Sequence, residues 1–176
     1  MGVLTNDPAT LHFPFDLPSS TRESLKFEEK SLVLTANQLV GRDWVLGARY
    51  RLTEGELTDR HPDIPYSSNG FPLDQDLKAW LHQMYLTAIY QHPCGLFGEF
   101  DAVWSQQSNQ GYSPDIPGDD FWQYNVYLGY RFLQRRGEAR VGLLNIGDRD
   151  YRLNPLTLYN ELPRERMLTV SLKLNF

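Results

Sequence analysis

This 176-residue chain has a single cysteine, no long apolar run and no excess of positive charge. Its only cysteine, Cys94, excludes an internal disulfide and leaves the redox compartment undetermined. No window approaches the ~18 uninterrupted apolar residues of a transmembrane helix, which excludes a helical membrane protein. The formal net charge of −5 argues against a nucleic-acid partner, because proteins that bind nucleic acids carry a basic footprint.

A catalytic constellation is missing as well. The groups available as nucleophile and base are His82, His92, Ser105 and Ser108, and no spacing among them supports a triad. We therefore expect no enzyme, no catalytic residue and no cofactor.

Alternation of apolar and polar residues is the feature that is present, most clearly along the last residues, 166–176. Because side chains alternate faces along a strand, this segment has one wholly apolar side, formed by Leu168, Val170, Leu172, Leu174 and Phe176. Its other side is polar and includes Ser171 and Lys173. Such a strand suits a soluble sheet over a core, and it suits a membrane barrel with lipid outside and a wet lumen inside.

The same alternation recurs upstream and predicts an all-β fold, an antiparallel meander of about seven strands. The expected strands are 31–39, 44–53, 81–91, 96–105, 122–132, 139–143 and 166–176. No helical period of useful length competes with this pattern. We expect residues 1–23 to form a loop or poorly ordered lead-in with at most one short strand, and residues 24–176 to form a transmembrane β-barrel segment.

The two faces of the expected strands differ in chemistry. Aromatic residues lie toward both ends of the apolar face, the order that a hydrocarbon slab with two watery borders selects. This predicted aromatic girdle is Trp44, Tyr50, Tyr90, Trp104, Trp122, Tyr124, Tyr130 and Phe132. The predicted lumen-facing polar residues are Arg49, Arg51, Glu99, Asp101, Gln123, Asn125, Arg131, Arg140 and Lys173. Their charges would guide an anionic solute, dock a plug or form an interstrand salt-bridge ladder. We favour the ladder, because buried charges must pair.

Connections between the expected strands alternate in length. Short turns at 40–43, 92–95 and 134–137 are separated by long loops at 58–76, 106–119 and 147–165. Outer-membrane barrels show this asymmetry, with tight turns on the periplasmic side and long loops outside. The pattern indicates part of a transmembrane β-barrel, with its carboxy terminus on the periplasmic side.

The end of the chain contains Leu143-Leu-Asn-Ile-Gly-Asp-Arg-Asp-Tyr-Arg-Leu-Asn-Pro155, then Leu162-Pro-Arg-Glu-Arg166 and a final strand that ends on Phe176. These segments resemble the end of TonB-dependent outer-membrane receptors, and the resemblance covers roughly residues 30–176. Segments 34–41 and 44–50 are similar to upstream hairpins of such barrels. The resemblance implies a bacterial outer-membrane location and uptake of a scarce solute. It also implies that Leu172, Leu174 and Phe176 form a membrane-insertion signal.

The same resemblance implies a set of partners. These are membrane lipid, the barrel-insertion machinery, a plug with upstream barrel strands, and an energy-coupling TonB-type protein that acts through regions absent from this chain. The family has a large barrel, on the order of 22 strands. With about seven strands and no visible signal peptide, we expect a carboxy-terminal portion of a longer receptor.

Two other functions remain open at this stage. Residues 10–16 would supply an eighth strand in a small self-contained outer-membrane barrel with a structural or adhesive role. Alternatively, a soluble ligand-binding β-barrel would place the aromatic face inside.

The long loops contain two features that we weighed as sites. The motif Pro-Asp-Ile-Pro occurs at 62–65 and at 114–117, where it would form a gripping rim or, as we favour, a rigid loop. Oxygen ligands for calcium are offered by Asp115, Asp119, Asp120 and Glu161. They lack calcium-loop spacing, so solvated loop acids are favoured and no metal is expected.

Overall fold

The computed structural model describes residues 2–4, 17–19, 22–62, 74–134, 136–157 and 161–175. All regular elements in these ranges are strands, and no helix there is long and apolar enough to cross a membrane. The eighth strand considered for residues 10–16 and the terminal Phe176 lie outside the described residues.

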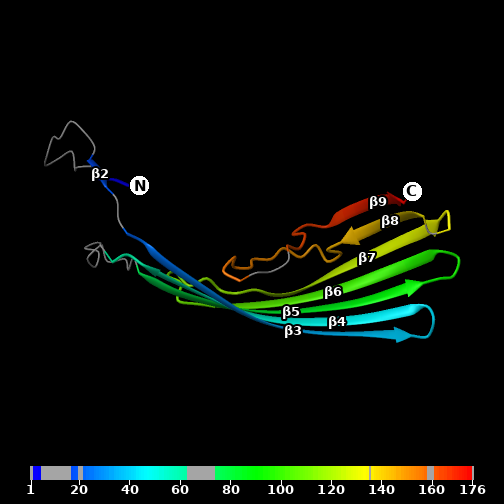
Figure 1. The fold of residues 1–176 in the computed structure, drawn as a ribbon, viewed down its shortest axis with the longest axis horizontal. Coiled ribbons are helices and arrows are strands. Elements are labelled where there is room, and N and C mark those ends of the chain that lie inside the picture. Colours follow the sequence, from blue (N-terminus) through cyan, green and yellow to red (C-terminus); the bar gives the residue numbers. More distant parts are fainter. Residues whose placement is uncertain are drawn as a thin grey trace.

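The main sheet is an antiparallel meander (Figure 1). Its strands pair in sequence order and are β3 (Ser24–Val40), β4 (Trp44–Arg60), β5 (Gln75–Gln91), β6 (Leu96–Gln110), β7 (Asp120–Phe132), β8 (Gly137–Leu144) and β9 (Met167–Leu174). The expected all-β meander of about seven strands is therefore confirmed. Two further strands, β1 (Gly2–Leu4) and β2 (Leu17–Ser19), form a separate small sheet, where one short strand at most was expected.

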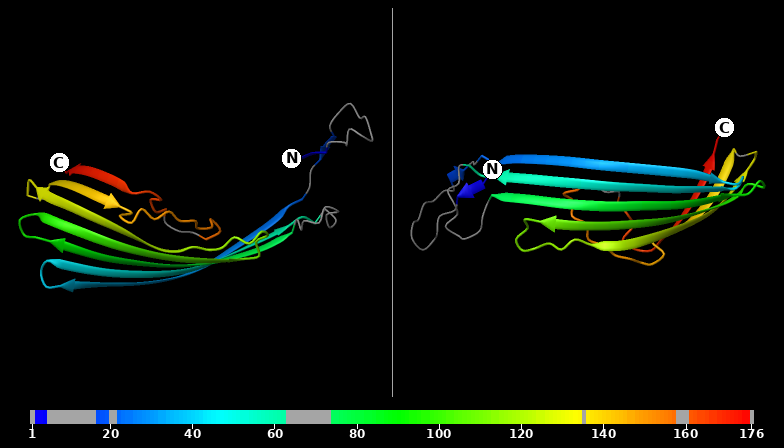
Figure 2. Two further views of the ribbon diagram at one scale, coloured as in Figure 1. Left: turned by 180° about the vertical axis from the view of Figure 1, so that it is seen from behind. Right: turned by 90° about the horizontal axis from the view of Figure 1, so that it is seen from below.

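The main sheet is curved and open. Within the described residues, β3 pairs only with β4 and β9 only with β8. Strands β3 to β7 run side by side along the long axis, as the second view in Figure 2 shows. The structure thus contains a curved wall and not a closed barrel.

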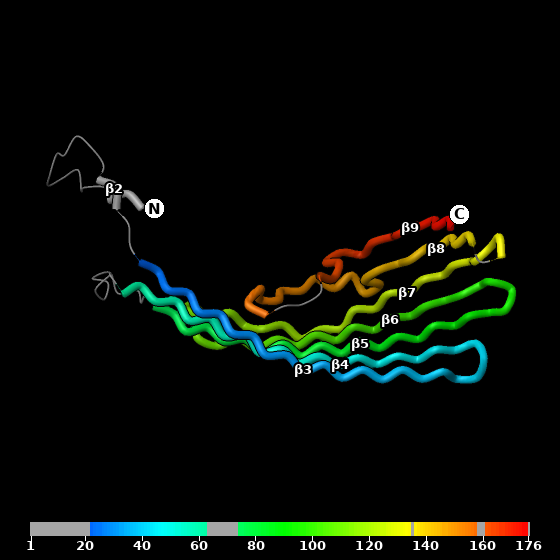
Figure 3. The backbone as a smooth tube through the Cα atoms, in the orientation of Figure 1, coloured from blue at the N-terminus to red at the C-terminus, as the bar shows by residue number. Residues whose placement is uncertain are grey.

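The short turns gather at one end of the sheet. Figure 3 shows the β3–β4, β5–β6 and β7–β8 turns together at the end opposite the long connections. Gly95, in the second turn, has φ +100°, and a Cβ there would lie 2.3 Å from the carbonyl oxygen of Arg131. Glycine is required there, because other residues rarely adopt this backbone conformation.

Several strands are longer than the alternation predicted. Strand β3 begins at Ser24 instead of residue 31, β4 continues to Arg60, and β5 begins at Gln75. In the added part of β3, Lys26 and Glu28 lie on the face of Leu32 while Leu25 and Phe27 lie on the other face, so the apolar face of the expected strand does not continue into it. Cross-strand ion pairs support the added parts of β4 and β5, with the Lys78 ammonium bonded to the carboxylates of Glu54 and Glu56.

The small apolar core lies on the concave side of the sheet. Residues 145–157 and 161–166, here called the covering segment, connect β8 to β9 and fold back over this side (orange in Figure 1). Tyr151 stacks on Phe121 of β7 with ring centroids 5.0 Å apart. The buried cluster consists of Leu81, Phe121, Tyr151 and Leu153, with Leu162 against it.

Candidate functional site

The outer face of the sheet, opposite the covering segment, is apolar and exposed. On β7, Trp122, Leu128 and Tyr130 are 38%, 57% and 48% exposed. Register places them beside outer-face residues of β6, with Trp104 opposite Trp122 and Leu96 opposite Tyr130. The aromatic face expected from the sequence is therefore the uncovered face.

This apolar surface ends at one common level across four strands. The last large residues before the change are Tyr50, Met84, Trp104 and Trp122, which lie in one row of the register. The next row holds Leu52, His82, Gln106 and Asp120, and the row after that begins with Glu54 on β4. We call the outer face between this level and the turn end the apolar belt.

Polar atoms of the aromatic rings are satisfied at this border. The hydroxyl of Tyr50 and Nδ1 of His82 share a hydrogen bond of 2.7 Å. The indole N–H of Trp104 donates to Asp120 Oδ1 at 2.7 Å. In an apolar environment, these polar groups would cost free energy if they had no hydrogen-bond partner. The aromatic side chains at this border therefore present an apolar ring to the belt and a hydrogen-bonded polar atom to its edge.

A second aromatic border lies near the turn end. Trp44 and Tyr90 face each other on β4 and β5 with ring centroids 5.0 Å apart. Tyr130 and Phe132 continue it on β7, close to the β7–β8 turn. Aliphatic residues and alanines fill the surface between the two borders, among them Leu46, Ala48, Leu86, Ala88, Ala102, Val126 and Leu128.

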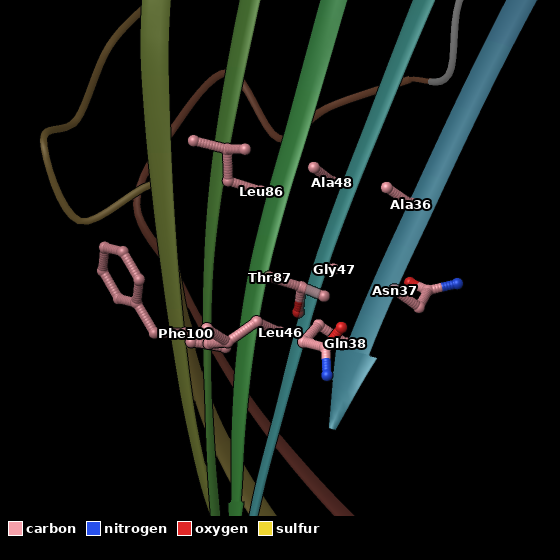
Figure 4. Close-up of a pocket in the computed structure, with 10 residues that line it drawn as sticks. Ala36, Asn37, Gln38, Leu46, Gly47, Ala48, Leu86, Thr87 and Phe100 are labelled. Carbon is pink, nitrogen blue, oxygen red and sulfur yellow. The ribbon is translucent and has the colours of Figure 1, made fainter. Parts of the chain in front are cut away.

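Within the belt lies a hollow with a volume of ≈ 490 Å³ (Figure 4). Small side chains of Ala36, Ala48 and Ala88 form part of it, and Leu86 and Phe100 stand higher beside them. The unevenness follows from side-chain size and not from a bend in the chain, since the strands pair regularly here.

The inner face of the sheet is polar and mostly covered. Gln123 is 1% exposed, although its neighbours Trp122 and Tyr124 are exposed. Other buried polar residues on this side are Thr53, Gln83, Ser105, Gln107 and Asn125. The polar residues thus form an interior, the reverse of a water-soluble sheet.

Two amides of the strands, Gln123 and Gln107, hold the covering segment against the sheet, and the amide of Asn145 acts within the segment itself. Gln123 Nε2 donates to the carbonyl oxygens of Arg149 and Pro163 at 3.2 and 2.9 Å. Gln107 Nε2 donates to the Thr157 hydroxyl at 2.9 Å. Asn145, which is fully buried, donates to the same two carbonyls as Gln123.

Close approach of the covering segment also depends on Gly55 of β4. A Cβ at this position would lie 2.9 Å from the carbonyl oxygen of Leu156. Sequence reasoning missed Gly55, Gln107 and Asn145, because their partners lie far away along the chain. The sequence feature that could have pointed to these contacts is the presence of amide residues at inward positions of β6 and β7.

The predicted lumen-facing charges lie on the inner side and form separate pairs. Arg131 Nε lies 2.9 Å from Glu138 Oε2, and an Arg140 nitrogen lies 3.0 Å from Glu99 Oε2. Arg51 lies 3.6 Å from Glu29 Oε1. These contacts are of the kind that the expected salt-bridge ladder requires.

The remaining members of this set have other neighbours. The Arg49 guanidinium lies 5.9 Å from the ring centroid of Tyr85. Asp101 accepts a hydrogen bond of 2.6 Å from Thr87. Lys173 is exposed on β9, opposite Glu138. The structure therefore brings the set to one face but not to one site.

Of the predicted insertion signal, Leu172 and Leu174 lie exposed on the outer side of β9. Phe176 lies outside the described residues.

The histidines and serines considered for catalysis do not converge. His82 lies on the outer face and His92 lies in the β5–β6 turn, where its Nδ1 is 2.9 Å from Cys94 Sγ. Ser105 is buried on the inner face, whereas Ser108 is exposed on the outer face.

The acids considered for calcium are not gathered either. Asp119 accepts from the backbone N–H of Arg152 at 2.8 Å, and Asp120 accepts from Trp104. The group that the described residues do bring together as possible metal ligands is Glu23, Asp59 and His61. Of the two Pro-Asp-Ile-Pro motifs, the second is an exposed coil, and residues 63–65 of the first lie outside the described residues.

Beyond the apolar belt, charged side chains pair on the surface. Arg60, at the end of β4, donates to both carboxylate oxygens of Asp76 at 2.7 Å. These hydrogen bonds favour the ionised carboxylate and hold the pKa of Asp76 below its ordinary value.

No protein-family model matches the chain, and no curated protein or solved structure matches it either.

Proposed function

We propose that this chain is a lipid-facing wall of an outer-membrane β-barrel, the carboxy-terminal part of a TonB-dependent receptor-like transporter that takes up a scarce solute. The observation that carries the proposal is the inverted sheet, whose apolar belt is exposed while amides such as Gln83, Gln107 and Gln123 are buried on the inner face. A monomeric protein in water rarely exposes contiguous apolar surface beyond a few hundred Å². A hydrocarbon solvent on the outer face accounts for the arrangement.

The height of the apolar belt supports the proposal that the outer face contacts lipid. On β4, apolar outward side chains extend from Trp44 through the border of the belt at Tyr50 to Leu52 and then give way to Glu54 and Glu56. This length is close to the ~9–11 residues with which a tilted strand crosses a bilayer. Aromatic rings at both borders match the two girdles of outer-membrane barrels.

The open edges support a wall that is completed by other strands. A bilayer does not tolerate unpaired strand edges, because no water is present to bond the free N–H and C=O groups. Strands β3 and β9 each have one free edge within the described residues. Upstream barrel strands of the receptor would pair with both edges, and a plug would occupy the lumen. The barrel-insertion machinery and a TonB-type protein complete the proposed partners.

The exposed face argues against the soluble alternative, which would place the aromatic residues inside. Fold and surface alone fit a small self-contained barrel as well, but the open edges favour the larger assembly.

Adjacent residues at the centre of the belt provide the test. A nitroxide label is attached at Ala88→Cys on the outer face or at Thr87→Cys on the inner face, in a Cys94→Ser background, with the full chain in lipid vesicles. We expect the label at 88 to collide mainly with oxygen, which concentrates in lipid, and the label at 87 to collide mainly with a water-soluble nickel complex. Equal exposure of both labels to the nickel complex would contradict the proposal.

A further inference from the structure

The outer ends of β3, β4 and β5 bring three potential metal ligands together. Glu23 precedes β3, Asp59 lies near the end of β4, and His61 follows it. One ligand atom from each lies within 4.8 Å of the other two. This cluster lies beyond the apolar belt and does not depend on the proposed function.

Two of these ligand atoms are buried without a hydrogen-bond partner. They are Oδ1 of Asp59 and Nδ1 of His61, which lie 3.7 Å apart. A buried polar atom left unpaired costs free energy of about 1–3 kcal/mol. Native proteins rarely leave such atoms unpaired, and a bound ion is one accepted explanation for them.

Asp74, at the start of β5, holds the histidine in place. Its Oδ1 accepts the backbone N–H of His61 at 2.8 Å and lies 3.9 Å from His61 Nδ1. A third carboxylate therefore lies beside the cluster. It is available as a fourth ligand and it adds negative charge.

Arg60 does not neutralise the cluster with its charged end. Its guanidinium points to Asp76, where it makes two hydrogen bonds of 2.7 Å. Successive residues of a strand face opposite sides, so the carboxylate of Asp59 lies on the other side from the Arg60 side chain.

We propose that Glu23, Asp59 and His61, with Asp74 beside them, bind a divalent transition metal of the zinc class. Imidazole and carboxylate are ligands that Zn²⁺ accepts at ~2.0–2.2 Å, in tetrahedral sites. Ligand atoms that now lie 3.7 to 4.8 Å apart need to close by only a small amount. Calcium, by contrast, takes six to eight oxygen ligands and not imidazole.

A bound ion would tie three strand ends together. Glu23, Asp59 and Asp74 belong to the ends of β3, β4 and β5, from which the chain leaves for its long connection at 63–73. The ion would thus fasten the base of this connection to the sheet.

The test is a Zn²⁺ titration of the full chain in competition with a chromophoric chelator. The Cys94→Ser background removes the exposed thiol beside His92, because a thiol and an imidazole are themselves zinc ligands and would compete with the proposed site. We expect one Zn²⁺ per chain and a loss of affinity of roughly ten- to hundredfold in His61→Gln and in Asp59→Asn, since even outer-shell changes have effects of this size. His82→Gln, which removes a histidine bonded to Tyr50, is the matched control and should bind like the parent.

The Glu23→Gln variant distinguishes the loss of a metal ligand from misfolding, because Glu23 is exposed and precedes the strand β3. It should lose affinity while circular dichroism shows unchanged strand content. Absence of Zn²⁺ binding by the parent, or equal binding by parent, His61→Gln and Glu23→Gln, would overturn the proposal. Displacement of Zn²⁺ by equimolar Ca²⁺ would also overturn it, because the imidazole would then play no part.

Discussion

The two faces of β7 differ more than any other pair of surfaces in the structure. Along this strand, Trp122 and Tyr124 are exposed, whereas Gln123 and Asn125, which alternate with them, are buried. Apolar burial in water contributes about 25 cal/mol per Å², so an aqueous sheet would be expected to have the opposite arrangement. The difference is the observation on which the proposed contact of the outer face with lipid rests.

The largest effect is expected from a charge placed on the outer face at the centre of the belt. Ala88→Arg should destabilise insertion in a bilayer by ~2–4 kcal/mol, the cost of arginine near the midplane of a barrel's lipid face. Thr87→Arg is the matched control, because residue 87 lies on the inner face beside Asp101, with which an arginine can pair. Heat-modifiable migration and membrane fractionation measure the folded, inserted fraction.

If Ala88→Arg and Thr87→Arg were tolerated equally, the outer face would not contact lipid, and the proposal that the two faces meet different environments would be wrong.

A smaller effect is expected where the inner face binds the covering segment. Gln123→Ala removes the amide that donates to the carbonyls of Arg149 and Pro163, which keep the Asn145 amide as a donor. The cost should be roughly 1–3 kcal/mol, about 0.5–1.5 kcal/mol for each hydrogen bond lost. Trypsin should then cleave at Arg149 or Arg152 faster than in the parent.

Gln106→Ala is the control for this change, since Gln106 is an exposed neighbour of Gln107 on the outer side. Unaltered cleavage in Gln123→Ala would show that the covering segment is held by apolar contacts and not by these hydrogen bonds.

The smallest effect is expected at the edge strand β9. Leu172 lies opposite Ala139, which in turn lies opposite Tyr130 at the border of the belt. Leu172→Arg should therefore cost about 1 kcal/mol, because the penalty falls toward the interface. Ser171→Arg points inward and should cost less still. The inserted fraction after refolding in vesicles distinguishes them, and a larger loss for Ser171→Arg would reverse the assignment of faces.

Much of the sheet was predictable because the alternation is local. Residues 122–132 show which side chains share a face, and the turn residues around Gly95 show where the chain reverses. The parts of β3 and β4 beyond the belt were not predictable in the same way. Lys26 and Glu28 there alternate with Leu25 and Phe27, which lie on the face opposite to Leu32 and Leu34, so the apolar face of the belt does not continue and the hydrogen-bonded register is needed to reveal the strand.

The interior contacts were the least predictable. Gln107 bonds to Thr157 across a separation of 50 residues, and neither residue has a distinctive local pattern. The cluster of Glu23, Asp59 and His61 depends likewise on the pairing of β3 with β4. Such contacts follow from register, which a one-residue shift would reverse.

The amino-acid sequence by itself determined that the chain forms antiparallel strands with one apolar and one polar face, because side-chain direction along a strand has a period of two. It also determined the alternation of short turns and long connections. Only the tertiary structure decided which face is covered, because that depends on the covering segment, residues 145–157 and 161–166, folding over the concave side. It likewise decided that the sheet remains open and that charged strand ends converge, since both depend on pairings between residues far apart in the chain.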